Sequence, residues 1–356
     1  MKKVFIVGPG ISLGGIERAS ANTANGLNNF GYSVTYHALF PHTQFFTLNK
    51  GIQYDKPELN LNRQHLSFFK TIFRMRRSIR KLKPDVVIVF GKFYAAITAL
   101  ALVGIKSRFI ISERSSPEYN WGFKINFFNR AAFILKMPHI VIAQTQVAAD
   151  VQRLYYSRHT KVEVIPNIVK DVRLYPEIER ENFILAVGRM NDHLKGFDQL
   201  IQAMAIVKTK WDLHIAGGDE LEGSQLLKLA ESLGIRKKIK LLGKIQDIDR
   251  LYATAGIFVI PSRSEGFPNA LVEAMAAGLP CISFNFVAGP SEIITNGIDG
   301  LLVTAGDVES LANEIDNLIL NKNIRELISL RALDSRGRYS EEKIISKLSQ
   351  LIENEC

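Results

Sequence analysis

The stretch IFVIPSRSEGFPNALVEAMAAG, residues 257–278, decides the fold class of this chain. Its first four residues are apolar and either β-branched or aromatic, which is typical of a buried strand. A loop containing Gly266 and Pro268 follows, and then a helical pattern opens near Asn269 and stops at Gly278. Another strand-like run follows at 280–283, so the order is strand, helix and strand, the unit from which parallel sheets are built.

The same alternation runs through both halves of the chain. The first half has predicted strands at 4–7, 33–38, 86–90, 108–111, 140–143 and 162–165, and predicted helices at 16–30, 66–82 and 95–102. The second half has predicted strands at 183–187, 213–216, 239–242, 257–260 and 280–283, and predicted helices at 197–208, 224–233, 248–255, 269–277 and 308–320. Strands rich in Val and Ile that are spaced by helices favour a parallel sheet covered on both faces.

The length of 356 residues is too great for one core and fits two domains. Residues 167–181 are polar and without helical or strand period, which is typical of a linker. We therefore expect an α/β protein with two doubly wound, Rossmann-like domains, residues 1–168 and 169–340, facing each other across a cleft. Ligands bind in such folds at the carboxyl ends of the strands.

The composition is that of a globular protein, with 47% apolar and 22% charged residues. The longest uncharged apolar stretch, 93–105, is shorter than the about 20 residues that cross a bilayer. The apolar run after Met1 is also too short for a signal peptide core, and two cysteines make a disulfide framework implausible. These features predict a cytoplasmic location.

Positive charge is concentrated in the first half. Residues 1–168 contain 23 Lys and Arg against 8 Asp and Glu, whereas residues 169–356 contain 22 against 27. Such asymmetry indicates that the first half faces a phospholipid surface or a nucleic acid, unless the charge only maintains solubility.

Residues 66–83 form a predicted helix without an acidic residue. Its apolar residues recur at helical spacing, and Lys70, Arg74, Arg77 and Lys81 form a separate stripe. Basic amphipathic helices dock on anionic membranes, although the stripe could also simply face water. No base-reading motif is recognisable, so we expect no nucleic acid partner. A second aromatic and basic segment, 119–136, could extend this face.

A glycine-rich loop, Gly8-Pro9-Gly10-Ile11-Ser12-Leu13-Gly14-Gly15, joins the first predicted strand to the first predicted helix. Glycines let the backbone approach a ligand closely, and a helix N-terminus favours an anion. A dinucleotide-dependent dehydrogenase is the obvious rival, but its glycine spacing differs and the second strand ends without a carboxylate for a ribose. A plain tight turn explains the loop equally well.

The second half carries two pairs of charged residues. Arg189 and Lys195 flank a turn that leads into a helix, where two cations can neutralise a diphosphate, or can be ordinary surface charges. Glu265 lies on the loop before the 269–277 helix and Glu273 lies within that helix. Two carboxylates there can hold two polyol parts of one ligand. The amides of Asn269, Ala270 and Leu271 are expected to be free and to point toward the same mouth.

The spacing of Glu265 and Glu273 resembles the E-x7-E motif of retaining glycosyltransferases of family 4, which have the two-domain GT-B fold. The resemblance extends to further motifs along nearly the whole chain: Gly14-Gly15-Ile16-Glu17-Arg18, Ile165-Pro166-Asn167, Gly188-Arg189 with Lys195-Gly196, Ala216-Gly217-Gly218, and Gly289-Pro290-Ser291-Glu292-Ile293-Ile294. It also implies that the helical stretch within 341–356 crosses back onto the first domain.

The resemblance implies a role for each matching residue. Arg189 and Lys195 would grip the donor diphosphate, Glu273 the ribose, and Glu265 the transferred sugar. Gly14 and Gly15 would lie under the diphosphate, and Lys244 and Ile245 would meet the base. The family uses no metal, and we expect neither a metal nor another cofactor. Retention implies front-face attack, in which the leaving phosphate oxygen helps to take the acceptor proton.

One segment departs from the family pattern. Many members have a His after the strand that ends here at Ile111, whereas this chain has Ser112-Glu113-Arg114-Ser115-Ser116-Pro117. That sequence resembles a subgroup acting in bacterial surface-polysaccharide and lipid-linked oligosaccharide assembly. Glu113 and Arg114 either contact the acceptor or form an internal ion pair that shapes the loop.

The sequence thus predicts a metal-independent enzyme of the inner face of the cell membrane. Its donor would be a nucleotide sugar and its acceptor a lipid-linked saccharide or lipopolysaccharide. The resemblance to the subgroup alone implies that the donor is a UDP-sugar rather than a GDP-sugar. The alternatives are a non-catalytic membrane-bound sugar-nucleotide sensor and a GT-B epimerase or phosphorylase.

Overall fold

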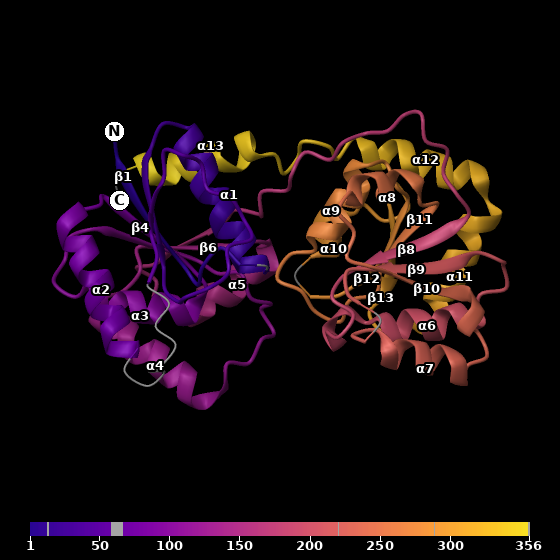
Figure 1. Ribbon diagram of the computed structural model, residues 1–356, viewed down its shortest axis with the longest axis horizontal. Helices are drawn as coiled ribbons and strands as arrows, with labels where there is room; N and C mark the ends of the chain where they lie inside the picture. The colour runs from indigo at the N-terminus through magenta and orange to yellow at the C-terminus, as the bar shows by residue number, and fades with distance from the viewer. Residues whose placement is uncertain (13, 58–66, 220, 288, 355–356) are drawn as a thin grey trace. The chain divides into compact units, whose positions relative to one another are not determined.

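The computed structural model describes residues 1–12, 14–57, 67–219, 221–287 and 289–354. The chain divides into two compact units. Unit 1 comprises Met1–Ile168 together with Glu341–Cys356, and unit 2 comprises Val169–Ser340. The last helix, α13 (Glu341–Glu353), therefore belongs to the unit that contains the start of the chain (Figure 1).

Unit 1 contains a seven-stranded parallel sheet in the order β3-β2-β1-β4-β5-β6-β7. Its strands are β1 (Lys3–Gly8), β2 (Ser33–Ala38), β3 (Gln53–Asp55), β4 (Val86–Phe90), β5 (Arg108–Ser112), β6 (Ile140–Ala143) and β7 (Lys161–Val164). Its other helices are α1 (Gly15–Asn29), α2 (Ser67–Leu82), α3 (Lys92–Leu102), α4 (Gly122–Leu135) and α5 (Gln146–Tyr155). The sequence order reverses between β1 and β4, where ligands bind in doubly wound sheets.

Unit 2 contains a six-stranded parallel sheet in the order β10-β9-β8-β11-β12-β13. Its strands are β8 (Phe183–Val187), β9 (Asp212–Ala216), β10 (Ile239–Gly243), β11 (Ile257–Ile260), β12 (Cys281–Asn285) and β13 (Leu301–Thr304). Its α-helices are α6 (Phe197–Ile206), α7 (Ser224–Ser232), α8 (Ile248–Thr254), α9 (Asn269–Ala276), α10 (Pro290–Ile293), α11 (Val308–Leu320) and α12 (Lys322–Leu333), and its 3₁₀ turns are η1 (His193–Lys195) and η2 (Arg236–Lys238). Here the order reverses between β8 and β11.

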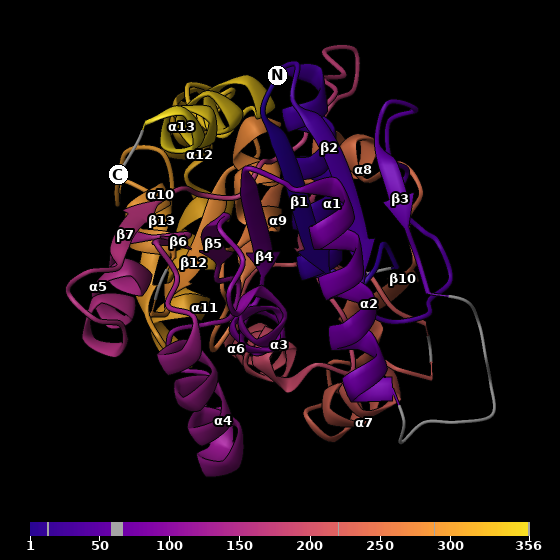
Figure 2. The ribbon, with the colours of Figure 1, turned by 90° about the vertical axis from the view of Figure 1, so that its left-hand side faces the viewer.

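The expected fold class is confirmed, and the central strands explain why it could be predicted from the sequence. Every residue of β4, β6 and β11 is buried, as a strand covered on both faces requires. Elements at the periphery were missed. The short strand β3 lies at the sheet edge beside β2 (Figure 2) and is only partly buried, so its sequence lacks an apolar signal. Strand β13 and the helices α4, α5, α10 and α12 were not predicted either.

Helix α13 packs on α1 and on the turn that follows α1 through specific contacts. The Tyr32 hydroxyl lies 2.7 Å from both Ser349 Oγ and Glu353 Oε1, and the Asn29 amide donates to Glu341 Oε1 at 2.8 Å. Gly26 allows close helix packing, because a Cβ there would stand 2.5 Å from the Ile345 side chain. The end of the chain is thus a structural part of unit 1.

Candidate active site

The charged residues of unit 2 meet where its strand order reverses. The loop after β8 carries Arg189 and Lys195, and the loop after the neighbouring strand β11 carries Glu265. Because parallel strands end at the same edge of the sheet, these two loops lie side by side. This is the position at which a doubly wound sheet binds its ligand.

Lys195 and Glu265 form an ion pair in this position. Lys195 Nζ lies 3.1 Å from Glu265 Oε1, and the two side chains are 22% and 12% exposed. The same carboxylate oxygen accepts a hydrogen bond of 2.6 Å from Ser262 Oγ. The ammonium and the carboxylate are both half-buried and in contact. The ammonium offers a positive charge for a phosphate, and the carboxylate offers a hydrogen-bond acceptor for hydroxyl groups.

Gly196 allows this contact because the two loops touch at its Cα. Its backbone is left-handed, with φ of 67°, and a Cβ there would stand 1.9 Å from the carbonyl oxygen of Pro261. No other residue type fits so close to a neighbouring backbone without moving it. Lys195, the preceding residue, is thereby held beside the β11 loop.

Arg263 joins the same two loops and was not recognised in the sequence. Its guanidinium makes two hydrogen bonds, of 2.7 and 2.6 Å, to the two carboxylate oxygens of Asp198, and its amide donates to the Leu194 carbonyl. Burial raises the pKa of Asp198, but the hydrogen bonds and positive charge of Arg263, together with hydrogen bonds from the backbone, hold that pKa below its usual value. The pair is a brace that fixes the geometry around Lys195.

Arg189 is placed differently from Lys195. Its side chain is 74% exposed and pairs with Asp192 at 2.6 Å, while Asp192 also caps η1 through the Leu194 amide. Of the two cations predicted for a diphosphate, only Lys195 lies against Glu265. Arg189 remains at the rim of the same loop.

Glu273 is buried, with 5% of its surface exposed. It lies one turn into α9, and the Tyr252 hydroxyl of α8 donates a 3.2 Å hydrogen bond to its Oε2. The alternative of an exposed helix carboxylate is therefore wrong. A buried carboxylate needs hydrogen-bond donors, and ligand hydroxyls can add to the one that Tyr252 provides.

The expectation of free amides at the start of α9 is corrected. The amide of Asn269 donates to the Phe267 carbonyl at 2.9 Å, and the amide of Leu271 donates to the Pro268 carbonyl at 3.0 Å. The loop folds back on the helix start and satisfies these donors itself. The predicted role of Asn269 and Leu271 as free backbone donors is wrong, while that of Ala270 stays a prediction.

Arg180 positions α9 from the segment expected to be a linker. Its guanidinium donates to five carbonyl groups at the carboxyl ends of α8 and α9, those of Tyr252, Ala253, Ala255, Ala277 and Gly278. A cation at two helix C-termini is favourable because the carbonyls there lack helical partners. This role could not be predicted from the sequence, since the five acceptors belong to the backbone.

Four further predicted donor contacts lie on loops or at the start of a helix. Gly14 precedes α1, and a Cβ there would stand 2.1 Å from Glu17 Oε2, whereas a Cβ on Gly15 would meet open space. Only Gly15 thus offers bare backbone. Lys244 and Ile245 are exposed and follow β10, an edge strand of unit 2. Their contact with a base stays a prediction.

The predicted acceptor residues lie on the loop after β5. Glu113 is buried, and its Oε1 accepts hydrogen bonds from the amides of Arg114 and Ser115. The Arg114 guanidinium points instead toward Asn167 and the Phe90 ring. The loop is therefore shaped by Glu113 and its neighbouring amides, without the Glu113–Arg114 side-chain ion pair that was one alternative. The inward position of Arg114 does not favour acceptor contact.

Glu113 also lines a cavity of about 260 Å³ in unit 1 that the sequence did not reveal. Its Oε2 has no hydrogen-bond partner in the described part of the chain, nor does the buried Oε1 of Gln152 on the cavity wall. Lys92 is buried there as well, with Nζ 3.8 Å from the centre of the Tyr155 ring. The rim carries Tyr119 and Trp121, which pack edge to face. Charged groups beside aromatic rings suit a polar ligand with apolar faces.

The basic stripe predicted on α2 is corrected at one position. Arg74 is partly buried and pairs with Asp55 at 2.9 Å, so it points toward β3 and not into solvent. Burial lowers the pKa of Arg74, against the effect of Asp55. Lys70, Arg77 and Lys81 are exposed. Phe69 and Phe73 are exposed too, at 81% and 71%, and share one side of the helix with Arg77 and Arg80 through spacings of four, four and three residues.

Within the described ranges, no helix is long and apolar enough to cross a membrane. The same residues contain no cluster of three His, Cys, Asp or Glu side chains that could hold a metal ion.

Comparison with known proteins covers nearly the whole chain. A family model described as Glycosyltransferase Family 4 matches residues 13–173, and one described as Glycosyl transferases group 1 matches residues 170–334. An uncharacterized glycosyltransferase of Haemophilus influenzae is 28% identical, over 98% of this chain and 99% of its own length. A second relative, from Campylobacter jejuni, is 27% identical over 92% of this chain and 91% of its own length. It is named GalNAc-alpha-(1->4)-GalNAc-alpha-(1->3)-diNAcBac-PP-undecaprenol alpha-1,4-N-acetyl-D-galactosaminyltransferase.

Among solved structures, Alr3699/HepE of Anabaena in complex with UDP has the same fold. Its TM-score is 0.78 at 19% identity, with 99% of both chains covered.

Proposed function

The chain belongs to the family 4 glycosyltransferases of the GT-B fold, and on that premise we propose that it is a retaining, metal-independent enzyme that transfers a sugar from a UDP-sugar to a lipid-linked saccharide or polysaccharide acceptor. The observation that carries the proposal is the Lys195–Glu265 pair where the strand order of unit 2 reverses, with buried Glu273 on the adjoining helix. UDP in the Anabaena structure and the undecaprenol-linked acceptor in the name of the Campylobacter relative support the choice of substrates.

In the proposed reaction, Lys195 neutralises the diphosphate as it leaves. The ammonium is a point charge already held in place, so it stabilises the developing negative charge without reorganisation. Glu265 accepts hydrogen bonds from hydroxyls of the transferred sugar, and Glu273 from the ribose. The bond between the sugar and the phosphate oxygen breaks while the acceptor oxygen bonds on the same face, and the acceptor proton passes to the leaving phosphate oxygen.

Assay of the products tests this proposal. With a panel of UDP-sugars and GDP-sugars and a lipid-linked saccharide, we expect transfer from a UDP-sugar that continues in excess EDTA. NMR of the product should show the same anomeric configuration as the donor. Inverted configuration, or activity that EDTA abolishes and a divalent metal restores, would refute retention or metal independence respectively.

The two glutamates should separate binding of nucleotide from binding of sugar. Glu273→Gln should weaken binding of UDP alone, because the ribose is present in both donor and product. Loss of the charged acceptor should cost about 1.5–3 kcal/mol. Glu265→Gln should leave UDP affinity nearly unchanged and impair binding of the intact donor and turnover. Calorimetry with UDP and with UDP-sugar measures both, and the reverse pattern would exchange the two assignments.

We place the acceptor in the unit 1 cavity beside Glu113. The unpartnered Oε2 of Glu113 and Oε1 of Gln152 offer acceptors for sugar hydroxyls, and Trp121 and Tyr119 offer apolar faces. Buried Lys92 supplies the adjoining positive charge. The exposed aromatic and basic face of α2 would hold unit 1 at the inner surface of an anionic membrane, where a lipid-linked acceptor is found.

The membrane part of the proposal makes a quantitative prediction. Each Lys or Arg near an anionic bilayer contributes about 1 kcal/mol, so Lys70→Gln, Arg77→Gln and Lys81→Gln together should weaken vesicle binding about 100-fold. Arg74 is kept, because it pairs with Asp55 inside unit 1. Cosedimentation with vesicles of neutral and anionic lipid at low and high salt measures the effect.

A matched control removes the same charge elsewhere. Lys208, Lys228 and Lys237 are exposed in unit 2, and their replacement by Gln should leave vesicle binding nearly unchanged. Equal loss in both triple variants, or binding that ignores salt and lipid charge, would show that α2 merely faces water.

A further inference from the structure

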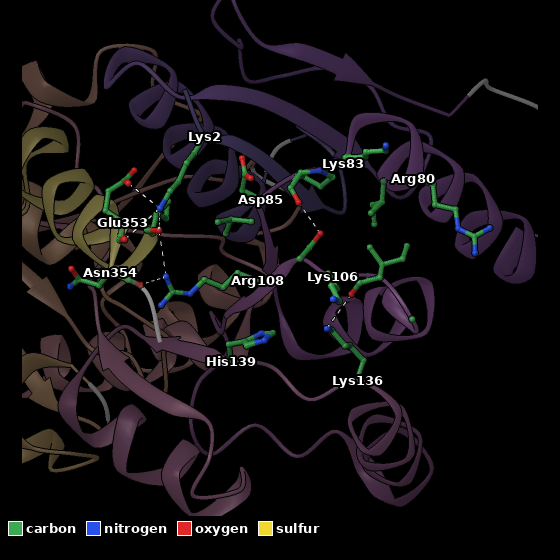
Figure 3. Close-up of a pocket in the computed structure, with 17 residues that line it drawn as sticks. Lys2, Arg80, Lys83, Asp85, Lys106, Arg108, Lys136, His139, Glu353 and Asn354 are labelled. Carbon is green, nitrogen blue, oxygen red and sulfur yellow. Dashed lines mark hydrogen bonds and ion pairs between the residues drawn. The ribbon is translucent and has the colours of Figure 1, made fainter.

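A second cavity, of about 960 Å³, lies in unit 1 at the amino-terminal edge of its sheet. It is bounded by the end of α2, the segments that lead into β4, β5 and β6, and the end of α13 (Figure 3). The loops 8–15 and 112–117 follow the opposite, carboxyl ends of strands in the same sheet. A five-residue strand such as β4 spans about 17 Å, so this cavity is separate from the donor and acceptor contacts that are predicted within unit 1.

The cavity is strongly cationic. It is lined by six basic side chains, those of Lys2, Arg80, Lys83, Lys106, Arg108 and Lys136, against the two acidic ones of Asp85 and Glu353. Both acids are already occupied. Glu353 pairs with Lys2 at 2.9 Å and accepts from the Tyr32 hydroxyl, and Asp85 accepts from the Lys3 amide at 2.7 Å.

The six cations differ in what they do (Figure 3). Lys2 and Arg108 bind carbonyl groups at the end of α13, and Lys136 donates to the Ile105 carbonyl. The side chains of Arg80, Lys83 and Lys106 have no hydrogen bond or ion pair within the described residues. Arg80 and Lys83 lie at the end of α2 and Lys106 lies on the segment that leads into β5, and all three line one cavity. Like charges that lie close together without partners repel one another, and a bound anion would reduce this repulsion.

Lys83 is held in an unfavourable backbone conformation at this cavity. Its φ of 48° is left-handed, and it is the only non-glycine residue with positive φ in the described chain. A residue without Cβ would end α2 there at lower cost. The fold therefore tolerates strain at a position that places an ammonium group on the cavity wall, as occurs where a side chain serves a ligand.

We propose that this cavity binds a phosphate-bearing anion, either the headgroup of an anionic lipid or a soluble phosphate ester or diphosphate. A phosphomonoester carries nearly two charges and several acceptor oxygens, so it can engage several of the unpartnered cations at once, which a single carboxylate cannot. A lipid headgroup has direct access, because Arg80 belongs both to the cavity and to the exposed face of α2 that carries Phe69 and Phe73.

His139 provides a reporter inside the cavity. Its Nδ1 accepts a hydrogen bond of 3.0 Å from the Phe109 amide, so the proton of the neutral ring is on Nε2. Burial, and then the neighbouring charge of Lys136, hold the pKa of His139 below its usual value. A bound anion would offset that positive charge and raise the pKa of His139.

The first experiment uses inorganic pyrophosphate and the full chain. NMR titration of His139 should show its pKa rising with pyrophosphate, and the dissociation constant from this signal should weaken about tenfold or more in Lys83→Gly with Lys106→Gln. The control Lys208→Gln with Lys237→Gln removes the same charge in unit 2 and should behave as wild type. Because the signal comes from His139, pyrophosphate bound near Lys195 does not contribute.

The second experiment uses vesicles of phosphatidylcholine with either phosphatidic acid or phosphatidylglycerol, matched in surface charge. Wild type should prefer the phosphomonoester headgroup of phosphatidic acid, and Lys83→Gly with Lys106→Gln should abolish that preference while keeping the attraction to both. If the protein shows the headgroup preference but no His139 response to pyrophosphate, the phosphate group comes from a lipid. If it shows only the His139 response to pyrophosphate, the ligand is soluble. General vesicle binding is the part of the proposed function that depends on α2. If the protein does not bind vesicles at all, the pyrophosphate titration still tests the cavity.

Stability distinguishes a ligand role from a structural one. Lys83→Gly relieves the left-handed backbone and should leave the melting temperature unchanged or higher while phosphate binding falls. Lys106→Gln alone should weaken binding without altering the fold. An unmoved His139 signal with pyrophosphate together with no headgroup preference, or equal responses in the double variant and wild type, would overturn the proposal.

Discussion

Replacing Lys195 by Ala is expected to lower kcat/KM for donor turnover by about 10²- to 10³-fold, which corresponds to about 2.7–4 kcal/mol of transition-state stabilisation. The ammonium is half-buried and fixed against Glu265, and among the described residues no second cation forms an ion pair with that carboxylate. The carboxylate of Glu265 would also lose its counter-charge and repel the diphosphate. Affinity for UDP should fall by about 1.5–3 kcal/mol, measured by calorimetry alongside the rate.

Two comparisons make this result interpretable. Lys237→Ala removes an exposed lysine of the same unit and should leave the rate unchanged. Arg189→Ala should have a smaller effect than Lys195→Ala, because Arg189 is largely exposed and paired with Asp192. Full activity and full UDP affinity in Lys195→Ala with an intact fold would remove Lys195 from the site.

Gly196→Ala is expected to destabilise unit 2 by about 3 kcal/mol, from about 1–2 kcal/mol for a left-handed residue with a Cβ and a further 1–3 kcal/mol for forcing the loops apart. The new Cβ would stand 1.9 Å from the Pro261 carbonyl oxygen. The melting temperature should fall by about 6–12 °C. Activity should fall as well, because Lys195 would move away from Glu265.

Gly234→Ala is the matched control, because Gly234 is also left-handed, with φ of 73°, but a Cβ there would meet open space. Its cost should be about 1–2 kcal/mol. The difference between the two variants isolates the contact between the loops after β8 and β11. Equal melting temperatures in the two variants would show that the close approach at Pro261 is not rigid.

The fold was predictable where burial imposes a pattern on the sequence. Strands β4, β6 and β8 begin and end at the predicted residues, because a strand covered on both faces must be continuously apolar and the flanking turns are polar. Strand β3, with the sequence Gln-Tyr-Asp, has no such pattern because it lies at an edge and is held by pairing with β2. Its position depends on a neighbour distant in sequence, which local periodicity does not report.

The candidate site was predictable as a set of residue types, while the contacts among them were not. The sequence identified Lys195, Glu265 and Glu273 but not the brace from Arg263 to Asp198, since those residues are 65 positions apart. Arg74 has the same helical spacing as its basic neighbours, yet it turns toward Asp55 of β3, a strand the sequence did not reveal. The amides of Asn269 and Leu271 donate to carbonyl groups of the preceding loop. The path of that loop could not be predicted from the sequence.

The most direct test of the donor site is a crystallographic or cryo-EM map of the protein with a bound UDP-sugar. We expect density at the carboxyl ends of β8 and β11, with the diphosphate on Lys195, the ribose hydroxyls on Glu273 and the sugar on Glu265. Density for the nucleotide elsewhere in the protein, or a diphosphate that leaves the Lys195–Glu265 pair untouched, would contradict this expectation.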